Sequence, residues 1–298
     1  MAHPHILHMI TPLKHMSPFD VNMALDAGFD AVVPYAQVTL EEVRGLVQDA
    51  IFSRSPTDAP RTGLFIAGKN ASLALDMAEA AQEAMVGPFR LSVFADPAGS
   101  FTTAAAMVAV VEAVLKEKHG KALKDVSVAI FGATGVVGYS AGVIAALEGA
   151  RVTLVGHDGV TRVQRSADEM KIRFGAEATA ADGSTKEKKA ALVAGADVVF
   201  CAAAAGVQVL STADLAAAER LLVAADVNAV PPAGIEGLSL DARGAAIPGA
   251  KALGVGPLAI GDIKYKTEAG LFRRMIETDE VLSLDFRDAF ALARQLVG

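Results

Sequence analysis

One short glycine-rich segment constrains the fold of this chain more than any other feature. The apolar run Val126–Phe131 has the composition of a buried strand, and a second apolar run, Val152–Val155, follows after a stretch of helical composition. A strand, a glycine turn, a helix and a second strand in this order are typical of a βαβ unit in a parallel sheet. The residues of the turn are Gly132, Ala133, Thr134, Gly135, Val136, Val137 and Gly138.

Each glycine of this segment satisfies a steric demand of dinucleotide binding. Gly132 permits a tight turn, Gly135 lets the backbone approach a pyrophosphate, and Gly138 lets the following helix pack closely on the sheet. The first N–H groups of that helix and the positive end of its dipole then face the anion. We therefore expect residues 132–138 to bind a dinucleotide cofactor; the alternative is an ordinary tight turn in an α/β domain.

The residues after the second strand are expected to select the cofactor. His157 and Asp158 follow Gly156 at about 20 residues from Gly138, where an acid binds the ribose hydroxyls of NAD. Arg162 and Arg165 lie close by and can instead face the 2′-phosphate of NADP. Asp158 can also simply cap the helix that follows. We therefore expect binding of NAD, NADP or both.

Two further strand ends in this half of the chain carry candidate cofactor residues. Ala202 and Ala203 are small enough to let a dinucleotide lie across the sheet edge, or they serve a close helix contact. Asn228 either reaches the nicotinamide or ribose, or acts as a turn residue ahead of Pro231. Cys201 is the single cysteine, which excludes an intrachain disulfide, and we interpret it as a core hydrophobe within its strand.

Apolar runs alternate with helical segments along all 298 residues, which predicts an α/β fold with parallel sheets. This length is about twice that of a usual domain. A polar segment near residue 119 marks a boundary, so we expect one domain of residues 1–118 with 268–298, and a Rossmann domain of residues 119–267. The expected strands are 6–10, 31–35, 64–67, 89–95, 126–131, 152–155, 198–202 and 221–225, and the last helices are 267–277 and 283–297.

Charge and composition exclude several classes of function. The net charge is −7, and the one local lysine cluster (Lys186, Lys188 and Lys189, interrupted by Glu187) reads as a solvated helix face, so we expect no nucleic acid partner. Apolar stretches such as Thr102–Leu115 are too short for a membrane span, and the N-terminus does not resemble a signal peptide. Neither the histidines nor the single cysteine form a paired ligand motif, so we expect no metal and a reducing cytoplasm.

Several segments together resemble the NAD(P)-dependent methylene-tetrahydromethanopterin dehydrogenases of methylotrophic bacteria, which are related to the methylene-tetrahydrofolate dehydrogenases. The resemblance spans nearly the whole chain. It implies oxidation of the methylene bridge of a reduced pterin to a methenyl cation by direct hydride transfer to the nicotinamide, in formaldehyde oxidation. It also implies a pterin site in the cleft between the two domains and a homo-oligomer, with a trimer favoured. The matching segments are Ser17–Asp20, Gly87–Arg90, Ser100–Ala106, Asp226–Ile235 and Ile260–Lys266.

The same resemblance assigns residues to the pterin. Lys264 lies beside it and can donate to its carbonyl or orient it; the alternative is a surface lysine where a helix begins. Asp20 matches an acid near the same place, and it can neutralise that lysine or face the nascent cation. Its alternative role is the N3 acid of a capping box that begins at Ser17. Lys266 is a further substrate-binding candidate, as a substitute for Lys264. Thr102 and Thr103 are the others; they begin a long helix and can equally be ordinary first-turn residues.

The implied reaction requires little general acid–base catalysis by the protein. Both nitrogens beside the methylene carbon donate electrons, so loss of hydride leaves a stabilised cation and no proton is removed.

In NADP-specific members the position after the second-strand glycine tends to be basic, and here it is His157 followed by Asp158, which fits members that accept both cofactors. Two rivals remain: a methylene-tetrahydrofolate or shikimate-like dehydrogenase, and a non-enzymatic NAD(P)-sensing protein.

Overall fold

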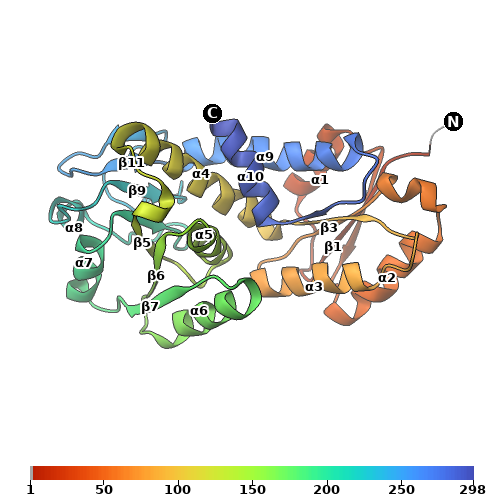
Figure 1. The fold of residues 1–298 in the computed structure, drawn as a ribbon, viewed down its shortest axis with the longest axis horizontal. Helices are drawn as coiled ribbons and strands as arrows, with labels where there is room; N and C mark the ends of the chain where they lie inside the picture. Colours follow the sequence, from red (N-terminus) through yellow and green to blue (C-terminus); the bar gives the residue numbers. More distant parts are fainter. Residues whose placement is uncertain (1–2) are drawn as a thin grey trace. The chain divides into compact units, whose positions relative to one another are not determined.

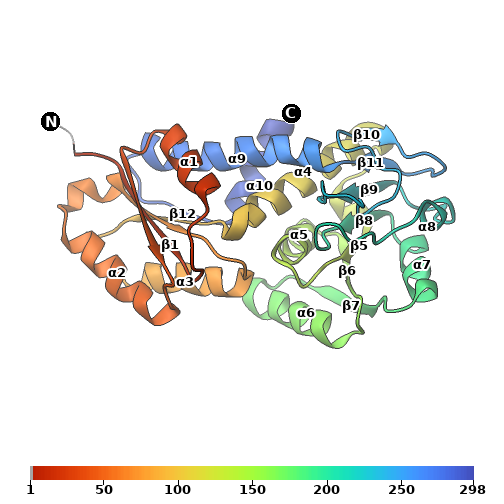
Figure 2. The same ribbon diagram turned by 180° about the vertical axis from the view of Figure 1, so that it is seen from behind.

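The computed structural model describes residues 3–298, which divide into two compact units. The first unit contains the chain up to Thr102 together with Tyr265–Leu292. The second unit contains Thr103–Lys264 together with Ala293–Gly298. Each unit is built on one β-sheet with helices packed against it (Figures 1 and 2).

The sheet of the first unit has five parallel strands in the order β12-β4-β3-β1-β2. Its central strand β3 is buried along its whole length, as expected for a strand covered on both faces. The edge strand β2 is partly exposed and contains Pro34, whose missing N–H is tolerated at a sheet edge. The strands are β1 (Ile6–Thr11), β2 (Ala31–Ala36), β3 (Thr62–Ile66), β4 (Ser92–Ala95) and β12 (Ser283–Leu284).

Local sequence signals explain where the helices of the first unit begin. The Glu42 carboxylate accepts a 2.7 Å hydrogen bond from the Thr39 N–H at the start of α2. The Asn70 side chain accepts a 3.0 Å hydrogen bond from the Leu73 N–H and caps α3. These helices are α1 (Pro18–Ala27), α2 (Leu40–Phe52) and α3 (Ala71–Glu83), and a 3₁₀ turn spans Pro56–Arg61.

The C-terminal part of the chain returns to complete the core of the first unit. Phe272 of α9 contacts both Phe65 and Phe94 of the sheet, with ring centroids 5.3 and 5.2 Å apart. These two sheet residues contact each other at 5.4 Å. Aromatic pairs at such distances contribute beyond their buried area, so this segment is part of the core. The long C-terminal helices are α9 (Pro257–Glu277) and α10 (Phe286–Val297).

The sheet of the second unit has seven strands in the order β10-β11-β9-β8-β5-β6-β7. All pairs are parallel except β10 with β11. β6 lies beside β5 on one side and β8 lies beside β5 on the other, so the strand order reverses between β5 and β8. Ligands of open α/β sheets bind at such a reversal, outside the carboxyl ends of the strands. The strands are β5 (Ser127–Phe131), β6 (Arg151–Gly156), β7 (Ala178–Asp182), β8 (Val198–Cys201), β9 (Val223–Asp226), β10 (Arg243–Ala246) and β11 (Leu253–Val255).

The helices of this unit connect the parallel strands. α5 packs against β5 and β6, and α6 packs against β6 and β7 (Figure 2). A left-handed Gly175 ends α6 at its C-cap, as is common for glycine at this position. The helices are α4 (Ser100–His119, of which residues from Thr103 onward belong here), α5 (Val136–Leu147), α6 (Thr161–Phe174), α7 (Lys186–Ala194) and α8 (Thr212–Ala216), with short 3₁₀ turns at Pro97–Gly99 and Leu123–Asp125.

Three sequence predictions need correction here. α9 begins at Pro257, ten residues before the predicted Thr267, because proline is well suited to the first position of a helix. The predicted helix 283–297 begins only at Phe286, since Ser283–Leu284 pairs with β4. Strands β7, β10 and β11 were not predicted, because their short segments are rich in alanine and glycine rather than β-branched residues.

The long helix α4 was assigned by its sequence to the first domain, and most of it lies in the second unit. A Cβ at Gly244 of β10 would lie 3.3 Å from the Val114 side chain of α4, so the two elements approach closely. By length and composition alone, the helical segment 97–119 is able to cross a membrane. However, 72% of its most apolar window is buried within the protein, as is usual for a core helix.

Candidate functional site

In the glycine turn between β5 and α5, the backbone at Gly132 and at Gly138 lies too close to its neighbours to hold any other residue. Gly132 has φ +78°, and a Cβ there would lie 2.2 Å from the Ala202 carbonyl oxygen at the end of β8. A Cβ at Gly138 would lie 2.4 Å from the Gly132 carbonyl oxygen. Gly135 is the N-cap of α5, and its N–H donates a 3.0 Å hydrogen bond to the Gly132 carbonyl. The backbone of the turn is thereby set against the carboxyl ends of β5 and β8.

A cavity of about 770 Å³ opens at this turn. Its size is that of a small-molecule or cofactor site. Its walls come from the carboxyl ends of β5 and β6 and from the segments that follow β7 and β8. Of the predicted cofactor residues, the cavity is lined by Gly132, Thr134, Gly135, His157, Ala202 and Ala203.

The other predicted cofactor residues lie around this cavity without lining it. Ala133 and Gly138 are buried beneath the turn, and Val136 and Val137 are half-buried in the first turn of α5. Asp158 and Arg162 lie at the surface beside the end of β6.

Asp158 and Arg162 form an ion pair at the position expected to select the cofactor. The Arg162 guanidinium donates to the Asp158 carboxylate at 3.2 Å and to the Thr134 hydroxyl at 3.2 Å. The hydrogen bond from Arg162 lowers the pKa of the Asp158 carboxyl. Both side chains remain about half exposed, at 46% and 53%. The site therefore offers a carboxylate for ribose hydroxyls, while the adjacent cation is already engaged.

The connection after β7 supplies cavity residues that sequence reasoning missed. Gly183 donates its N–H to the Gly156 carbonyl at 2.8 Å, and a Cβ there would lie 2.4 Å from the Val155 side chain. The interpretation of the lysine cluster as a solvated helix face is incomplete, because Lys186 and Lys189 line the cavity. Their spacing of three residues, which places them on one face of α7, was the signal that could have found them. The other lining residues of this connection are Ser184 and Thr185.

Asn228 holds its own loop and also accepts a hydrogen bond from the Gly206 N–H, at 3.4 Å, in the segment after β8. Its side-chain amide donates to the Pro232 carbonyl at 3.0 Å, and its side-chain oxygen accepts from the Val230 N–H at 2.9 Å. Its own N–H donates to the buried Asp226 carboxylate at 2.9 Å. Asn228 is 5% exposed, so these contacts favour the turn role over a contact with the nicotinamide. Cys201 is fully buried nearby, and burial raises the pKa of its thiol, as expected for a core residue.

In the first unit, the structure separates the candidates by burial. Asp20 lies in the first turn of α1 and is 2% exposed, and the Ser17 side chain makes no capping hydrogen bond. The predicted capping box is therefore not formed. The Thr102 hydroxyl is buried and donates to Asp96 at 2.6 Å, which favours its first-turn role. Asp96, which also accepts from the Phe101 N–H at 2.8 Å, caps the first turn of α4 and was not among the predicted residues. Thr103 is half-buried.

Lys264 lies within α9, seven residues after its first residue, so the alternative of a surface lysine where a helix begins does not hold. It is half-buried, whereas Lys266 is exposed. Residues two apart on a helix do not share a face, so Lys266 cannot substitute for Lys264. The half-exposed rings of Phe19 and Tyr265 contact edge to face with centroids 6.5 Å apart, beside Asp20 and Lys264 in sequence.

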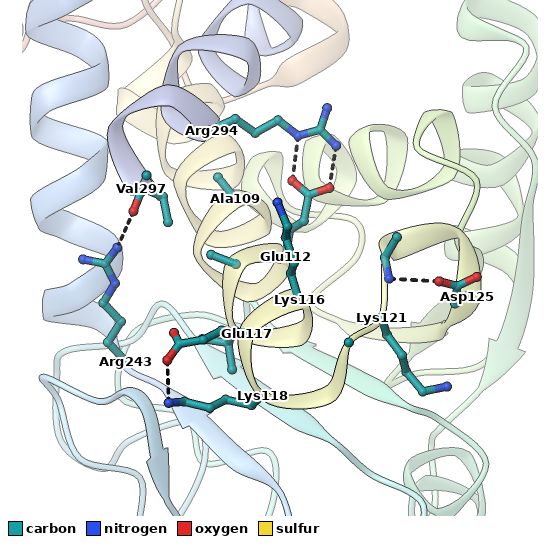
Figure 3. Close-up of a pocket in the computed structure, with 15 residues that line it drawn as sticks. Ala109, Glu112, Lys116, Glu117, Lys118, Lys121, Asp125, Arg243, Arg294 and Val297 are labelled. Carbon is teal, nitrogen blue, oxygen red and sulfur yellow. Dashed lines mark hydrogen bonds and ion pairs between the residues drawn. The ribbon is translucent and has the colours of Figure 1, made fainter.

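A second cavity of the second unit, of about 1140 Å³, contains none of the predicted residues (Figure 3). Arg294 of α10 holds the Glu112 carboxylate of α4 through two hydrogen bonds of 2.6 Å and also donates to Glu148 at the end of α5. Arg243 donates to the Val297 carbonyl at 2.9 Å (Figure 3). These contacts tie α4, α5, α10 and β10 together, which is a structural role. Among residues 3–298, no group of three or more His, Cys, Asp or Glu side chains is placed to hold a metal ion.

Two solved structures share the fold of this chain. A solved NAD-dependent malic enzyme from Thermotoga maritima superposes with a TM-score of 0.57 at 13% identity, over 97% of this chain and 84% of that one. Shikimate 5-dehydrogenase from Listeria monocytogenes, solved with shikimate and NAD, superposes with a TM-score of 0.50 at 15% identity, over 92% and 93%. These likenesses confirm the predicted α/β fold class with a Rossmann-type sheet.

Closer sequence relatives are more specific. A family model described as "Methylene-tetrahydromethanopterin dehydrogenase, N-terminal" matches residues 18–98. The bifunctional protein MdtA of Methylorubrum extorquens is 32% identical over 280 residues, which is 94% of each chain. The NAD(P)-dependent methylenetetrahydromethanopterin dehydrogenase of the same organism is 55% identical over 293 residues, which is 98% of this chain and 99% of that one. The chain therefore belongs to the family of methylenetetrahydromethanopterin dehydrogenases.

Proposed function

We propose that this protein oxidises methylene-tetrahydromethanopterin to methenyl-tetrahydromethanopterin and passes the hydride directly to NAD⁺ or NADP⁺. The observation that carries this proposal is the glycine turn at the mouth of the 770 Å³ cavity, in a chain of this family. The two close approaches at Gly132 and Gly138 leave room for backbone alone, as a turn that cradles a pyrophosphate requires.

The residues of the second unit fit the dinucleotide. In the proposal, the backbone of residues 132–138 and the N-terminus of α5 bind the pyrophosphate. Asp158 accepts from the ribose hydroxyls, and Ala202 and Ala203 leave space at the strand end. The bound nicotinamide supplies the hydride acceptor, and the chain supplies orientation and the exclusion of water.

Asp20 and Lys264 are the residues proposed to act on the pterin. Positive charge develops on the carbon that loses hydride, because its two nitrogen neighbours share the electron deficit. A carboxylate held in low-dielectric surroundings stabilises such a charge, and Asp20 is 2% exposed. Lys264 orients the pterin through its carbonyl. No proton is removed in this step, so neither residue needs to act as a base.

The test is a steady-state assay of nicotinamide reduction with purified protein. It compares methylene-tetrahydromethanopterin with methylene-tetrahydrofolate, each with NAD⁺ and with NADP⁺, and includes shikimate. We expect turnover with the methanopterin derivative. Turnover with the folate or with shikimate alone would assign the chain to those dehydrogenases. Cofactor binding without any turnover would favour the NAD(P)-sensing alternative.

We further propose a cytoplasmic location and a homo-oligomer, with a trimer as the expected state. The family membership and the single buried cysteine support this proposal. Light scattering during size-exclusion chromatography measures the subunit count, and a monomer at working concentration would contradict the oligomer.

A further inference from the structure

We infer that Lys186 binds the 2′-phosphate of NADP and thereby gives this chain its capacity to use NADP beside NAD. The inference rests on the proposed function, because it concerns the same cofactor cavity. It assigns the phosphate to the segment after β7, rather than to the arginine that follows β6.

The sheet register places Lys186 on the correct side of the cavity. β6 and β7 are paired so that Gly156 lies opposite Asp182. The residues after β7 therefore run beside His157 and Asp158, where the adenosine ribose of a bound dinucleotide lies. The hydrogen bond from the Gly183 N–H to the Gly156 carbonyl, at 2.8 Å, holds the two segments together. Lys186 then enters the cavity wall as the first residue of α7.

The neighbouring cations Arg162, Lys188 and Lys189 each already have an anionic or carbonyl partner. Arg162 is paired with Asp158 and hydrogen-bonded to Thr134. Lys188 is paired with Asp182, and hydrogen bonds from Lys188 and Ser184 lower the pKa of Asp182 to about 2.

Lys189, the remaining lysine of the cluster, donates its Nζ to the Val209 carbonyl. Lys186 differs from these cations: within residues 3–298 no hydrogen bond or ion pair holds its ammonium, although the Glu187 and Asp214 carboxylates interact with it electrostatically. It is also exposed, so its ammonium can reach a ligand at the cavity mouth.

Charge balance explains why a further cation is needed. The Asp158–Arg162 pair is neutral overall, and a phosphate monoester carries about −1.5 to −2 at neutral pH. Asp158 alone would repel that phosphate. A lysine at the first position of α7 is itself unfavourable, because the helix dipole already places positive charge there. The combined positive potential of this ammonium and the helix N-terminus suits an anionic ligand.

The test uses Lys186→Gln with Lys188→Gln as the matched control, because Lys188 is on the same helix but paired with Asp182. Calorimetric titrations with NAD⁺, NADP⁺ and 2′,5′-ADP measure binding without any need for turnover. We expect Lys186→Gln to weaken NADP⁺ and 2′,5′-ADP by about tenfold, the effect of one hydrogen bond to a charged group. NAD⁺ affinity should change by less than about twofold.

Three further measurements sharpen the result. Lys186→Arg should restore most of the NADP⁺ affinity, and the control should keep the wild-type ratio of NADP⁺ to NAD⁺ affinity. Because the contact is exposed, added salt should lower that ratio in the wild type more than in Lys186→Gln. The ratio of kcat/KM for the two cofactors should follow the ratio of affinities.

Several outcomes would overturn the inference alone. These are an unchanged NADP⁺ affinity in Lys186→Gln, an equal loss for both cofactors, or a wild type that binds NAD⁺ but not NADP⁺. A wild type that binds neither nucleotide would overturn the proposed function as well. Normal titrations without pterin turnover would contradict the proposed function and leave the assignment of Lys186 supported.

Discussion

Replacing Gly132 by alanine tests the close approach on which the cofactor site depends. Its φ of +78° is left-handed, and a non-glycine residue there costs about 1–2 kcal/mol. The new Cβ would also lie 2.2 Å from the Ala202 carbonyl oxygen, which belongs to the backbone and cannot rotate away. Forcing a methyl group into packed surroundings costs about 1–3 kcal/mol more. We therefore expect Gly132→Ala to lose about 2–5 kcal/mol of unfolding free energy.

Gly249 provides a control with the same backbone conformation. Its φ is +76°, and nothing lies within 4 Å of a Cβ built there. Gly249→Ala should lose only the conformational contribution of about 1–2 kcal/mol and should bind NAD⁺ normally. Urea unfolding followed by far-ultraviolet circular dichroism measures both losses, with unchanged slopes required for the comparison. Equal losses in the two variants, or normal NAD⁺ affinity in Gly132→Ala, would refute the reasoning.

Three further predictions concern side chains. Asp158→Ala should weaken NAD⁺ binding more than NADP⁺ binding and shift the kcat/KM ratio toward NADP⁺ by about tenfold, because it removes a ribose acceptor and a repulsive charge; an equal loss for both cofactors would contradict this role. Lys264→Ala should lower turnover or pterin affinity and leave NAD(P)⁺ titrations unchanged, whereas Lys266→Ala, on another face of α9, should have little effect. Matching kinetics in the two variants would return Lys264 to a surface role. Arg294→Ala should lower the unfolding free energy by about 1–3 kcal/mol, because two carboxylates lose their charged partner, without changing cofactor affinity in the same titrations.

The first βαβ unit of the Rossmann half, from β5 to β6, could be predicted well because its signals are local. A buried strand, three glycines at fixed spacing and a following helix are properties of consecutive residues, and the structure leaves no room for a Cβ at Gly132 or Gly138. The ion pair of Asp158 and Arg162 joins the turn after β6 to the second residue of α6, so it too is formed by residues close together in the sequence. The predicted start of α9, which carries Lys264, lies ten residues after the observed one. The glycine and proline residues of its first turns are more typical of a loop than of a helix.

Other features depend on residues far apart in the sequence. Lys186 belongs to the cavity only because β7 pairs with β6 in one register, and the buried Asp226 keeps Asn228 within its own loop. The sequence by itself determined most of the element types, the glycine turn and the family of this protein. Only the tertiary structure decided which lysines line the cavity and which polar residues hold a loop or a helix start. The reason is physical: propensity and spacing act along the chain, whereas sheet register and burial are set by contacts between distant segments.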